Sequence, residues 1–480
     1  MAEQLLMGGR QRDAHEGKTF TVYEPATGEP LAEVAEAGPA DVDEALEVAV
    51  RAFEEGPWPR TSATQRGRVL MRAASLVRER VEEFASVEAR NGGKPIRGAR
   101  GEIETVASTL EYYAGAANKF FGEVVPVQDP GLDVVLHVPV GPAALITPWN
   151  FPLQIATWKL APALACGNPF VLKPAGYTPL TALMLGRLLV EAGVPEECVS
   201  VLPGPGSTVG NALVSDPRAA KVSFTGSTEV GASILKTSAD NIARVSLELG
   251  GKSASIVFAD GDLEACAAAS VGAAFDNAGQ DCCARSRILV ERPAYADFLS
   301  LYQKHVEAVR LGPPLDESTD MGPLISERQR ETVRGYIELG REEGARVVVG
   351  GGLPEEPGLQ AGWYLAPTIL ADVDNRWRVA REEIFGPVVA VVPFDTEHDA
   401  VRMANDSDYG LSGSLWTSNI GRALRVSKAV RTGVMSVNSS HSVHQEAPFG
   451  GFKKSGIGRE LGMHSMKLYT EVKNIFFSTE

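Results

Sequence analysis

Two adjacent cysteines, Cys282 and Cys283, follow a polar segment that contains a glycine, Gly279 to Asp281. A buried and inert role is the commoner one for a cysteine. A thiolate, however, is a good nucleophile, and a thiol with an ordinary pKa of about 8.5 needs help from its surroundings to form one. Because a polar approach is less typical of a packed core, these cysteines are candidate nucleophiles.

Two polar residues close predicted strands and could assist such a nucleophile. Glu248 follows the apolar run 245–247 and precedes two glycines, so it could act as a general base or simply be solvated. Asn150 lies shortly after the run 144–146, where it could cap the next helix or donate a hydrogen bond to an oxyanion. The carboxyl ends of parallel strands meet at one edge of a sheet, so we expect a site there.

Glycines at junctions between strands and helices could approach phosphate groups. Gly204, Gly206 and Gly210 form a G-x-G-x-x-x-G pattern, one residue longer than the usual dinucleotide fingerprint, and could equally be turn residues. A second pattern, which starts at Gly226, continues with alanine and serine where a P-loop needs lysine, and this excludes that motif. Gly226 and Ser227 precede a predicted helix, where free amides and the helix dipole suit a pyrophosphate.

The elements that would position these residues alternate between strands and helices from about residue 143 onward. Five strands with intervening helices predict an α/β fold with a parallel sheet, wound by right-handed crossovers. The expected strands are 144–146, 170–172, 199–202, 221–224 and 245–247. Proline, serine and threonine are typical of helix N-termini, so helices should begin near Pro152, Pro179, Ser207 and Thr228.

Other parts of the chain extend this architecture. Helical periodicity predicts helices over residues 40–53, 65–90 and 103–121, ahead of the sheet. A second α/β region is expected from about Gly251 to Lys454. Residues 132–138 and 467–477 have the pattern of strands outside both sheets, and two such strands could pair into an arm that joins subunits.

The composition excludes several classes of protein. Of the 480 residues, 44% are hydrophobic and 22% charged, which is ordinary for a globular protein of two or three domains. A net charge of −15 argues against a nucleic-acid partner, and no apolar stretch is long enough to span a membrane. The five cysteines form neither a disulfide framework nor a zinc-ligand pattern, and the polar N-terminus is no secretory signal. We therefore expect a cytoplasmic protein without a metal.

Six motifs, in the order of the chain, resemble those of the aldehyde dehydrogenase superfamily, and the resemblance spans essentially the whole sequence. They are Pro148–Pro152, Phe224–Gly231, Glu248–Lys252, Gly279-Gln280 with Cys282, Glu383–Pro387 and Pro448–Gly451. The resemblance implies a nucleotide-binding domain (1–122 and 140–249), a catalytic domain (250–454) and a small β oligomerisation arm (123–139 and 455–480). It also implies a homodimer or homotetramer.

The resemblance further implies oxidation of an aldehyde to a carboxylic acid with NAD, or with NADP, through a thiohemiacetal and a thioester. Cys282 rather than Cys283 is the implied nucleophile, because the family's cysteine stands second after Gly-Gln. Glu248 corresponds to the general base, and Asn150 and the backbone amide of Cys282 correspond to the oxyanion hole. Two alternatives stay open: an acylating enzyme that uses coenzyme A, against which Glu248 argues, and a nucleotide-binding protein without activity.

Cofactor and substrate residues follow from the same resemblance. Lys173 should reach the adenosine ribose, Ser227 the pyrophosphate and Glu383 the nicotinamide ribose. The implied cofactor-binding residues are Ile146, Thr147, Trp149, Lys173, Gly176, Gly206, Gly210, Phe224, Gly226, Ser227, Leu249, Gly250, Glu383 and Phe385. The implied substrate tunnel is lined by Phe151, Ile155, Trp158, Asp281, Cys283, Val443 and Phe449.

Three positions depart from the family's pattern. Gly176 replaces a usual glutamate, which predicts a weakened preference for NAD over NADP. Arg285 stands where glycine is frequent, and the sequence offers no physical account of it. Asp281 replaces an apolar residue or a cysteine, and together with Glu446 it could favour a cationic aldehyde, such as an amino or trimethylammonium aldehyde. Alternatively, both acids face solvent or pair with Arg285.

Overall fold

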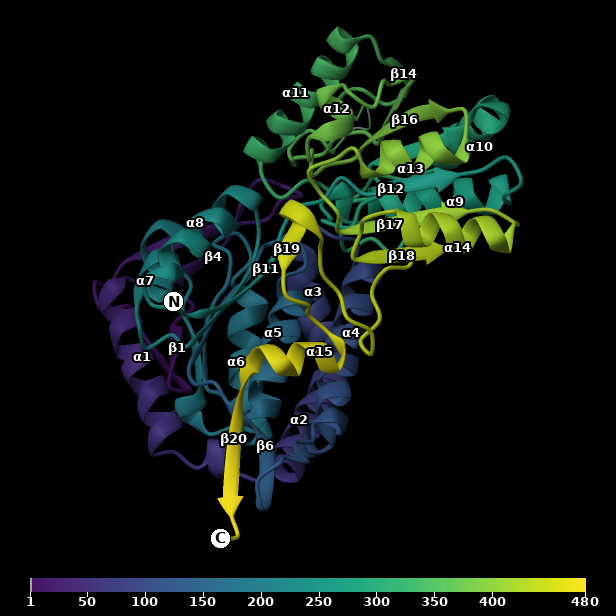
Figure 1. Cartoon of the computed structure of the whole chain (residues 1–480). Coiled ribbons are helices and arrows are strands. Elements are labelled where there is room, and N and C mark those ends of the chain that lie inside the picture. The colour runs from purple at the N-terminus through teal and green to yellow at the C-terminus, as the bar shows by residue number, and fades with distance from the viewer. Residues whose placement is uncertain (1, 355, 357) are drawn as a thin grey trace.

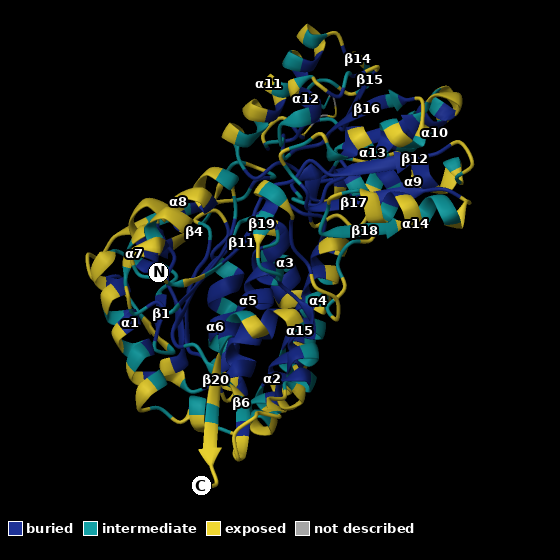
Figure 2. Ribbon diagram, viewed as in Figure 1, coloured by how far each residue is buried: buried dark blue, intermediate teal, exposed yellow. Residues whose placement is uncertain are grey.

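The computed structural model describes residues 2–354, 356 and 358–480. Two lobes, each built around a sheet, lie side by side, and the C-terminal strand projects from the larger one (Figure 1). In both lobes the strands are buried beneath helices whose outer faces are exposed (Figure 2). Among the described residues, no helix has both the length and the apolar content needed to cross a bilayer.

The first lobe contains an eight-stranded sheet with the order β19-β11-β10-β7-β8-β9-β1-β2. Its centre is parallel, and all five predicted strands are confirmed there. They are β7 (Ala143–Ile146), β8 (Phe170–Lys173), β9 (Val199–Val201), β10 (Lys221–Thr225) and β11 (Arg244–Glu248). The N-terminal segment adds antiparallel strands β1 (Leu5–Met7) and β2 (Arg10–Arg12), and β3 (Thr19–Tyr23) and β4 (Pro30–Ala35) form a separate hairpin.

The helices between these strands begin close to the predicted positions. They are α5 (Pro152–Cys166), α6 (Leu180–Ala192), α7 (Asn211–Ser215) and α8 (Thr228–Ala239), and a π-helical turn, Gly206–Gly210, precedes α7. Proline occupies the first turn of α5, and Ser227 caps α8 by accepting a hydrogen bond from the amide of Val230. Every residue of α5 except Gln154 is buried, because this helix is apolar on nearly all sides.

The helices ahead of the sheet differ from the prediction at two places. They are α1 (Pro39–Glu54), α2 (Ala63–Glu79), α3 (Val81–Gly92) and α4 (Ile96–Ala116). The helix predicted over 65–90 is two helices that meet at Arg80, whose backbone is not helical. The helix predicted over 103–121 starts directly after Pro95 and ends at Ala116. Glycines and arginines interrupt the apolar pattern of its first two turns, so periodicity alone placed the start too late.

The second lobe confirms the expected second α/β region. Its seven-stranded sheet has the order β14-β15-β16-β13-β12-β17-β18, and only β14 is antiparallel to its neighbour. The strands are β12 (Ala254–Val257), β13 (Arg287–Glu291), β14 (Arg346–Val349), β15 (Thr368–Ala371), β16 (Val388–Phe394), β17 (Ser412–Trp416) and β18 (Val434–Val437). The helices are α9 (Leu263–Phe275), α10 (Tyr295–Glu307), α11 (Glu327–Glu343), α12 (Arg378–Arg381), α13 (Glu397–Asn405) and α14 (Ile420–Ala429).

The two strands predicted outside both sheets pair with each other. Strand β20 (Thr470–Ser478) runs antiparallel to β6 (Gly131–Pro139), and β5 (Glu123–Val125) completes a three-stranded sheet. The residues between the second lobe and β20 do not belong to the three-stranded sheet. Strand β19 (Gly456–Ile457) joins the first sheet beside β11, and residues Gly462–Met466 form helix α15. The predicted strand over 467–477 therefore begins only at Thr470, after a 3-10 turn.

Candidate active site

Two cavities meet at the carboxyl edge of the first sheet, and Thr225, Glu248 and Cys282 line both. The larger cavity has a volume of about 540 Å³ and opens between α4, α5, α9 and residues 440–445. The smaller one has a volume of about 230 Å³ and lies beside the N-terminus of α8. A group on Cys282 is therefore accessible from both sides.

A left-handed turn presents Cys282 to these cavities. Asn277, Ala278 and Gly279 all have positive φ angles, of 50°, 56° and 69°. A Cβ at Gly279 would lie 2.3 Å from the carbonyl oxygen of Gly386, so only glycine fits there. The neighbouring Cys283 thiol, followed by burial, raises the pKa of Cys282 well above its ordinary value. The thiol therefore needs a base before it can act as a nucleophile.

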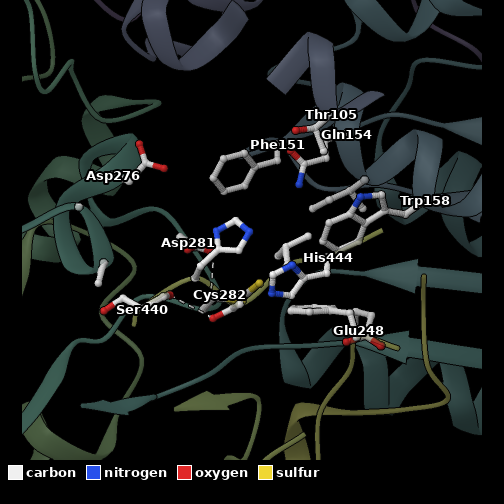
Figure 3. A pocket seen from close by; sticks show the side chains of 18 of the residues that line it. Thr105, Phe151, Gln154, Trp158, Glu248, Asp276, Asp281, Cys282, Ser440 and His444 are labelled. Carbon is white, nitrogen blue, oxygen red and sulfur yellow. Dashed lines mark hydrogen bonds between the residues drawn. The ribbon is translucent and has the colours of Figure 1, made fainter. Parts of the chain in front are cut away.

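Glu248 is the one carboxylate among the described residues that lines both cavities (Figure 3). It ends β11, is 3% exposed, and neither of its carboxylate oxygens has a hydrogen-bond partner. Burial, and then the negative charge of Glu460, raise the pKa of Glu248 well above its ordinary value. Oε1 lies against Gly450, where an added Cβ would be only 2.5 Å away. An unpaired carboxylate with a raised pKa is suited to accept a proton from water.

A buried ion pair behind Glu248 was not predicted from the sequence. The ammonium of Lys159 pairs with the carboxylate of Glu460, and both side chains are buried. Ser223, on β10, accepts a hydrogen bond from Lys159 at 3.1 Å and donates one to Glu460 at 3.2 Å. Lys159 is the only charged residue of the apolar helix α5, which is a signal that sequence analysis could have used.

Asn150 lies beside the nucleophile turn and does not cap α5. Its side-chain amide donates a hydrogen bond to the carbonyl of Gln280 at 2.9 Å, and its own carbonyl accepts one from Asn277 at 2.8 Å. The alternative role as a helix cap is therefore wrong, since α5 has no side-chain cap. Instead, the buried carboxylates of Glu88 and Glu102 accept hydrogen bonds from the first amides of α5.

All seven residues expected in the substrate tunnel lie on the wall of the larger cavity. They are Phe151, Ile155, Trp158, Asp281, Cys283, Val443 and Phe449. Trp158 and Phe449 pack together with ring centroids 5.2 Å apart. Further polar residues line this wall: Thr105, Gln154, Thr225, Asp276, Arg285, Ser440, His441, Ser442, His444 and Gln445. Thr105, Gln154, Asp276, Ser440 and His444 are labelled in Figure 3. Their loops and helix turns carry no motif that would have marked them.

The two acids proposed to favour a cationic aldehyde have different positions. Asp281 lines the cavity and accepts a hydrogen bond from the amide of Cys283 at 2.9 Å, and burial raises its pKa to about 6. Glu446 is exposed and does not line the cavity, although its neighbour Gln445 does, so for this acid the alternative of facing solvent holds. Arg285 forms no ion pair with either acid in the described part of the chain, and its donors bond to neutral oxygens. Pairing with Arg285 is therefore wrong.

The smaller cavity has the character of a nucleotide site. Seven of the residues expected to bind a cofactor line it: Trp149, Gly226, Ser227, Leu249, Gly250, Glu383 and Phe385. A Cβ on Gly250 would lie 2.2 Å from the Glu383 carboxylate, and one on Gly226 would lie 2.4 Å from the Phe224 ring, so both glycines keep the cleft open. Trp149 and Phe385 meet edge to face, 5.2 Å apart.

The other seven expected cofactor residues do not line this cleft but lie at or near the ends of strands of the same sheet. Ile146 ends β7 and Thr147 follows it, Lys173 ends β8 and Gly176 lies shortly after it, Phe224 lies in β10, and Gly206 and Gly210 bound the π-helical turn. The hydroxyl of Thr147 is buried without a partner, and burial lowers the pKa of Lys173 to about 8. An unpartnered hydroxyl and a buried amine at a sheet edge suit a polar ligand such as a ribose.

Comparison with known proteins gives one consistent family. The profile of the aldehyde dehydrogenase family matches residues 12–475. The sequence is 39% identical to betaine aldehyde dehydrogenase of Bacillus subtilis (strain 168), covering 100% of this chain and 98% of that one. It is 41% identical to human retinaldehyde dehydrogenase 3, covering 98% and 92%. The structure of betaine aldehyde dehydrogenase from Staphylococcus aureus, solved with NAD+, superposes with a TM-score of 0.98 at 36% identity, covering 100% and 95%.

Proposed function

The chain belongs to the aldehyde dehydrogenase family, and from this premise we propose that it oxidises an aldehyde to a carboxylic acid with NAD+ and water. The observation that carries the proposal is the shared wall of the two cavities. Cys282 and Glu248 stand between a space for an aldehyde and a space for a nucleotide. In this arrangement a substrate bound to Cys282 can first be oxidised on the side of the nucleotide and then be hydrolysed with the help of Glu248.

In the first half of the reaction, the sulfur of Cys282 attacks the aldehyde carbon and gives up its proton to a base. The resulting oxyanion is stabilised by the side-chain amide of Asn150 and the backbone amide of Cys282. Asn150 uses one amide hydrogen for Gln280, which leaves the second one for the oxyanion. When bound, NAD+ supplies the acceptor for the hydride that this adduct loses as the Cys282 thioester forms.

In the second half, Glu248 accepts a proton from water while the water oxygen attacks the thioester carbon. The bond between this carbon and the Cys282 sulfur breaks, and the carboxylic acid leaves. Burial of Glu248 supports this role, because a raised pKa makes the carboxylate a stronger base. Ser227, Lys173 and Glu383 are the polar residues that would hold the nucleotide, between Trp149 and Phe385 on one side and α8 on the other.

We propose a cationic aldehyde as the substrate and NADP+ as an accepted second cofactor. Asp281 and Asp276 face the cavity together with Trp158, Phe151 and Phe449. Arg285 also lines it, but its donors point to neutral protein oxygens, so the two carboxylates and the aromatic rings favour a cation. The relative from Bacillus subtilis is a betaine aldehyde dehydrogenase, which agrees with this preference. Gly176 offers neither the hydrogen bonds nor the charge with which a glutamate would exclude a 2′-phosphate.

The three-stranded sheet supports a homodimer or homotetramer. Its apolar side chains Val124, Leu132, Val472 and Phe477 are 69%, 47%, 65% and 54% exposed, and a second copy of the chain would cover them. Sedimentation of the Phe477→Asp variant should give a smaller species than the unmodified chain. The five cysteines are all free, in keeping with the proposed reducing cytoplasm.

The proposed reaction is tested with a panel of aldehydes: betaine aldehyde, a neutral aldehyde of similar length, benzaldehyde and retinal. Each is assayed with NAD+ and with NADP+ by the absorbance of the reduced nicotinamide, and the acid product is identified by mass spectrometry. We expect reduction that depends on the aldehyde, with an equal amount of acid. The Cys282→Ala variant is the control, and turnover by this variant would overturn the mechanism.

A further inference from the structure

Arg285 is a buried cation without a carboxylate partner in the described part of the chain. Its side chain is 1% exposed. Nε donates to the hydroxyl of Ser414 at 2.8 Å, Nη1 donates to the carbonyl of Cys283, and Nη2 donates to the carbonyl of Gly413 at 3.2 Å. A buried charge is costly unless its donors are satisfied, and here neutral oxygens do this. The guanidinium thus holds Cys283, directly after the nucleophile, against β17.

The same guanidinium reaches the loop that forms one wall of the larger cavity, residues 438–445, called here the wall loop. Nη2 donates to the hydroxyl of Ser442 and lies 3.5 Å from the carbonyl of Ser440. The wall loop carries His441, Val443 and His444, which line the cavity. One planar side chain therefore joins the nucleophile turn to the wall loop.

Few other hydrogen bonds hold the tip of the wall loop. Ser436, in the preceding strand β18, donates to the carbonyl of His441, and the hydroxyls of Ser412 and Ser442 lie 2.9 Å apart. Among the described residues, the side chains from outside β18 and the loop that bond to residues 440–442 are Arg285 and Ser412. Loss of Arg285 would leave the tip with the bond from Ser436 and, from outside β18 and the loop, only the hydroxyl pair of Ser412 and Ser442.

We infer that Arg285 is a specificity-determining positioning residue, which sets the distance between the wall loop and Cys282 and so the shape of the aldehyde site. The inference rests on the proposed oxidation of aldehydes at Cys282. A side chain at position 285 that lacks the several N–H donors of a guanidinium would let the wall loop move. Aldehydes of different shape would then react at more similar rates.

The test measures selectivity as the ratio of kcat/KM between the best and the poorest aldehyde of the panel. This ratio does not depend on how much of the enzyme is folded. In Arg285→Met we expect the ratio to fall toward one by about ten-fold. Arg285→Lys keeps the charge but cannot bridge the same acceptors, so it should lose a similar part of the selectivity. An unchanged ratio in either variant would overturn the inference.

A matched control lies two residues further along the chain. Arg287 is also buried and bonds neutral acceptors, the side chain of Asn375 at 2.8 Å and the carbonyl of Met403 at 3.1 Å, but it does not line the cavity. Arg287→Lys should lower the melting temperature without changing the selectivity ratio. If Arg287→Lys changed the selectivity ratio as much as Arg285→Lys does, the loss of selectivity would come from a general destabilisation of the second lobe.

Ser442→Ala keeps the inference testable if the Arg285 variants fail to fold. It removes the hydroxyl that Arg285 bonds, and we expect the selectivity ratio to fall by a few-fold. An unchanged ratio in Ser442→Ala would by itself overturn the inference. In the Arg285→Met background the same change removes only the contact with Ser412, so its effect should be smaller than in the unmodified chain, and equal, additive effects would contradict the inference. An unmodified chain that oxidises no aldehyde would instead overturn the proposed function, so the two failures are distinguishable.

Discussion

The side-chain amide of Asn150 donates a hydrogen bond to the backbone carbonyl of Gln280, with 2.9 Å between nitrogen and oxygen. Asn150 follows the central strand of the first sheet, whereas Gln280 belongs to the turn that precedes Cys282 in the second lobe. The bond therefore joins the two lobes at the reacting atoms. It also fixes the orientation of the amide, so that its second hydrogen can serve an oxyanion on a substrate held by Cys282.

Asn150→Ala should lower kcat by about 10²- to 10³-fold, the usual cost of removing one oxyanion donor. KM should change little, because the ground-state aldehyde carries no full charge. Steady-state kinetics on betaine aldehyde would measure both constants. The rate of alkylation of Cys282 by iodoacetamide serves as the control, since it requires an intact nucleophile turn but no oxyanion hole. A variant with near-normal kcat would remove Asn150 from the proposed mechanism.

Cys282→Ala should abolish oxidation of aldehydes, while Cys283→Ala should retain most of it. Cys282 lines both cavities, whereas Cys283 lines only the larger one. Cys283→Ala should also lower the pKa of Cys282, because the neighbouring thiol is the largest cause of its elevation. Alkylation rates measured against pH would report this shift. An inactive Cys283 variant beside an active Cys282 variant would reverse our assignment of the nucleophile.

The convergence of Cys282, Glu248 and Asn150 was predictable because two of them follow parallel strands. The ends of such strands lie at one edge whatever the details of packing, and the family's motifs add the cysteine. The five central strands are parallel, and Glu248 and Asn150 lie at their carboxyl edge, where both line the smaller cavity with Cys282. The arm strands were also visible in the sequence, because their patterns fit neither sheet.

The pair of Lys159 and Glu460 was not predictable in the same way. The two residues are 301 positions apart, and neither belongs to the motifs that mark the family. Their meeting depends on how the segment around β19 folds back beside β11. The shape of the wall loop could not be predicted from the sequence either, because it depends on the buried contacts of Arg285. Periodicity reports which face of an element is buried, but not the path of a chain between elements.

Glu248→Gln should convert steady oxidation into a burst of reduced nicotinamide followed by a rate about 10²- to 10⁴-fold slower. Glutamine cannot accept the proton from water, so the thioester accumulates. In the unmodified enzyme, hydrolysis should fall as pH drops through the raised pKa of Glu248, because only the ionised carboxylate is a base. Stopped-flow absorbance and the pH profile of kcat would measure both effects.

Glu460→Gln provides the matched control for this pH dependence. The negative charge of Glu460 is one cause of the raised pKa of Glu248. Its removal should therefore move the acidic limb of the kcat profile to lower pH while hydrolysis persists. If the acidic limb of the kcat profile does not move in Glu460→Gln, or if it is still present in Glu248→Gln, the pH dependence belongs to a group other than Glu248.

Gly176→Glu should shift the ratio of kcat/KM for NAD+ over NADP+ upward by about ten- to a hundred-fold. A Cβ at this position has no neighbour within 4 Å, so the side chain can be added without strain. Its carboxylate would accept hydrogen bonds from the ribose and repel a 2′-phosphate. Gly176→Gln separates these causes, because it keeps hydrogen bonding without the charge. Strict and equal dependence on NAD+ in all three forms would contradict the expected role of Gly176.

The last prediction concerns Asp281, the carboxylate next to the nucleophile on the cavity wall. Asp281→Asn should raise KM for betaine aldehyde by about ten-fold and leave KM for a neutral aldehyde of similar length nearly unchanged.

Burial raises the pKa of Asp281 to about 6, so the carboxylate is charged above this pH and neutral below it. In the unmodified enzyme, KM for the cation should therefore rise as pH falls through about 6, whereas KM for the neutral aldehyde should not. Glu446→Gln is the control, because Glu446 is exposed and lies off the cavity wall. If both aldehydes respond alike to Asp281→Asn, the residue only orders the nucleophile turn through its bond to Cys283, and a neutral aldehyde becomes the better substrate hypothesis.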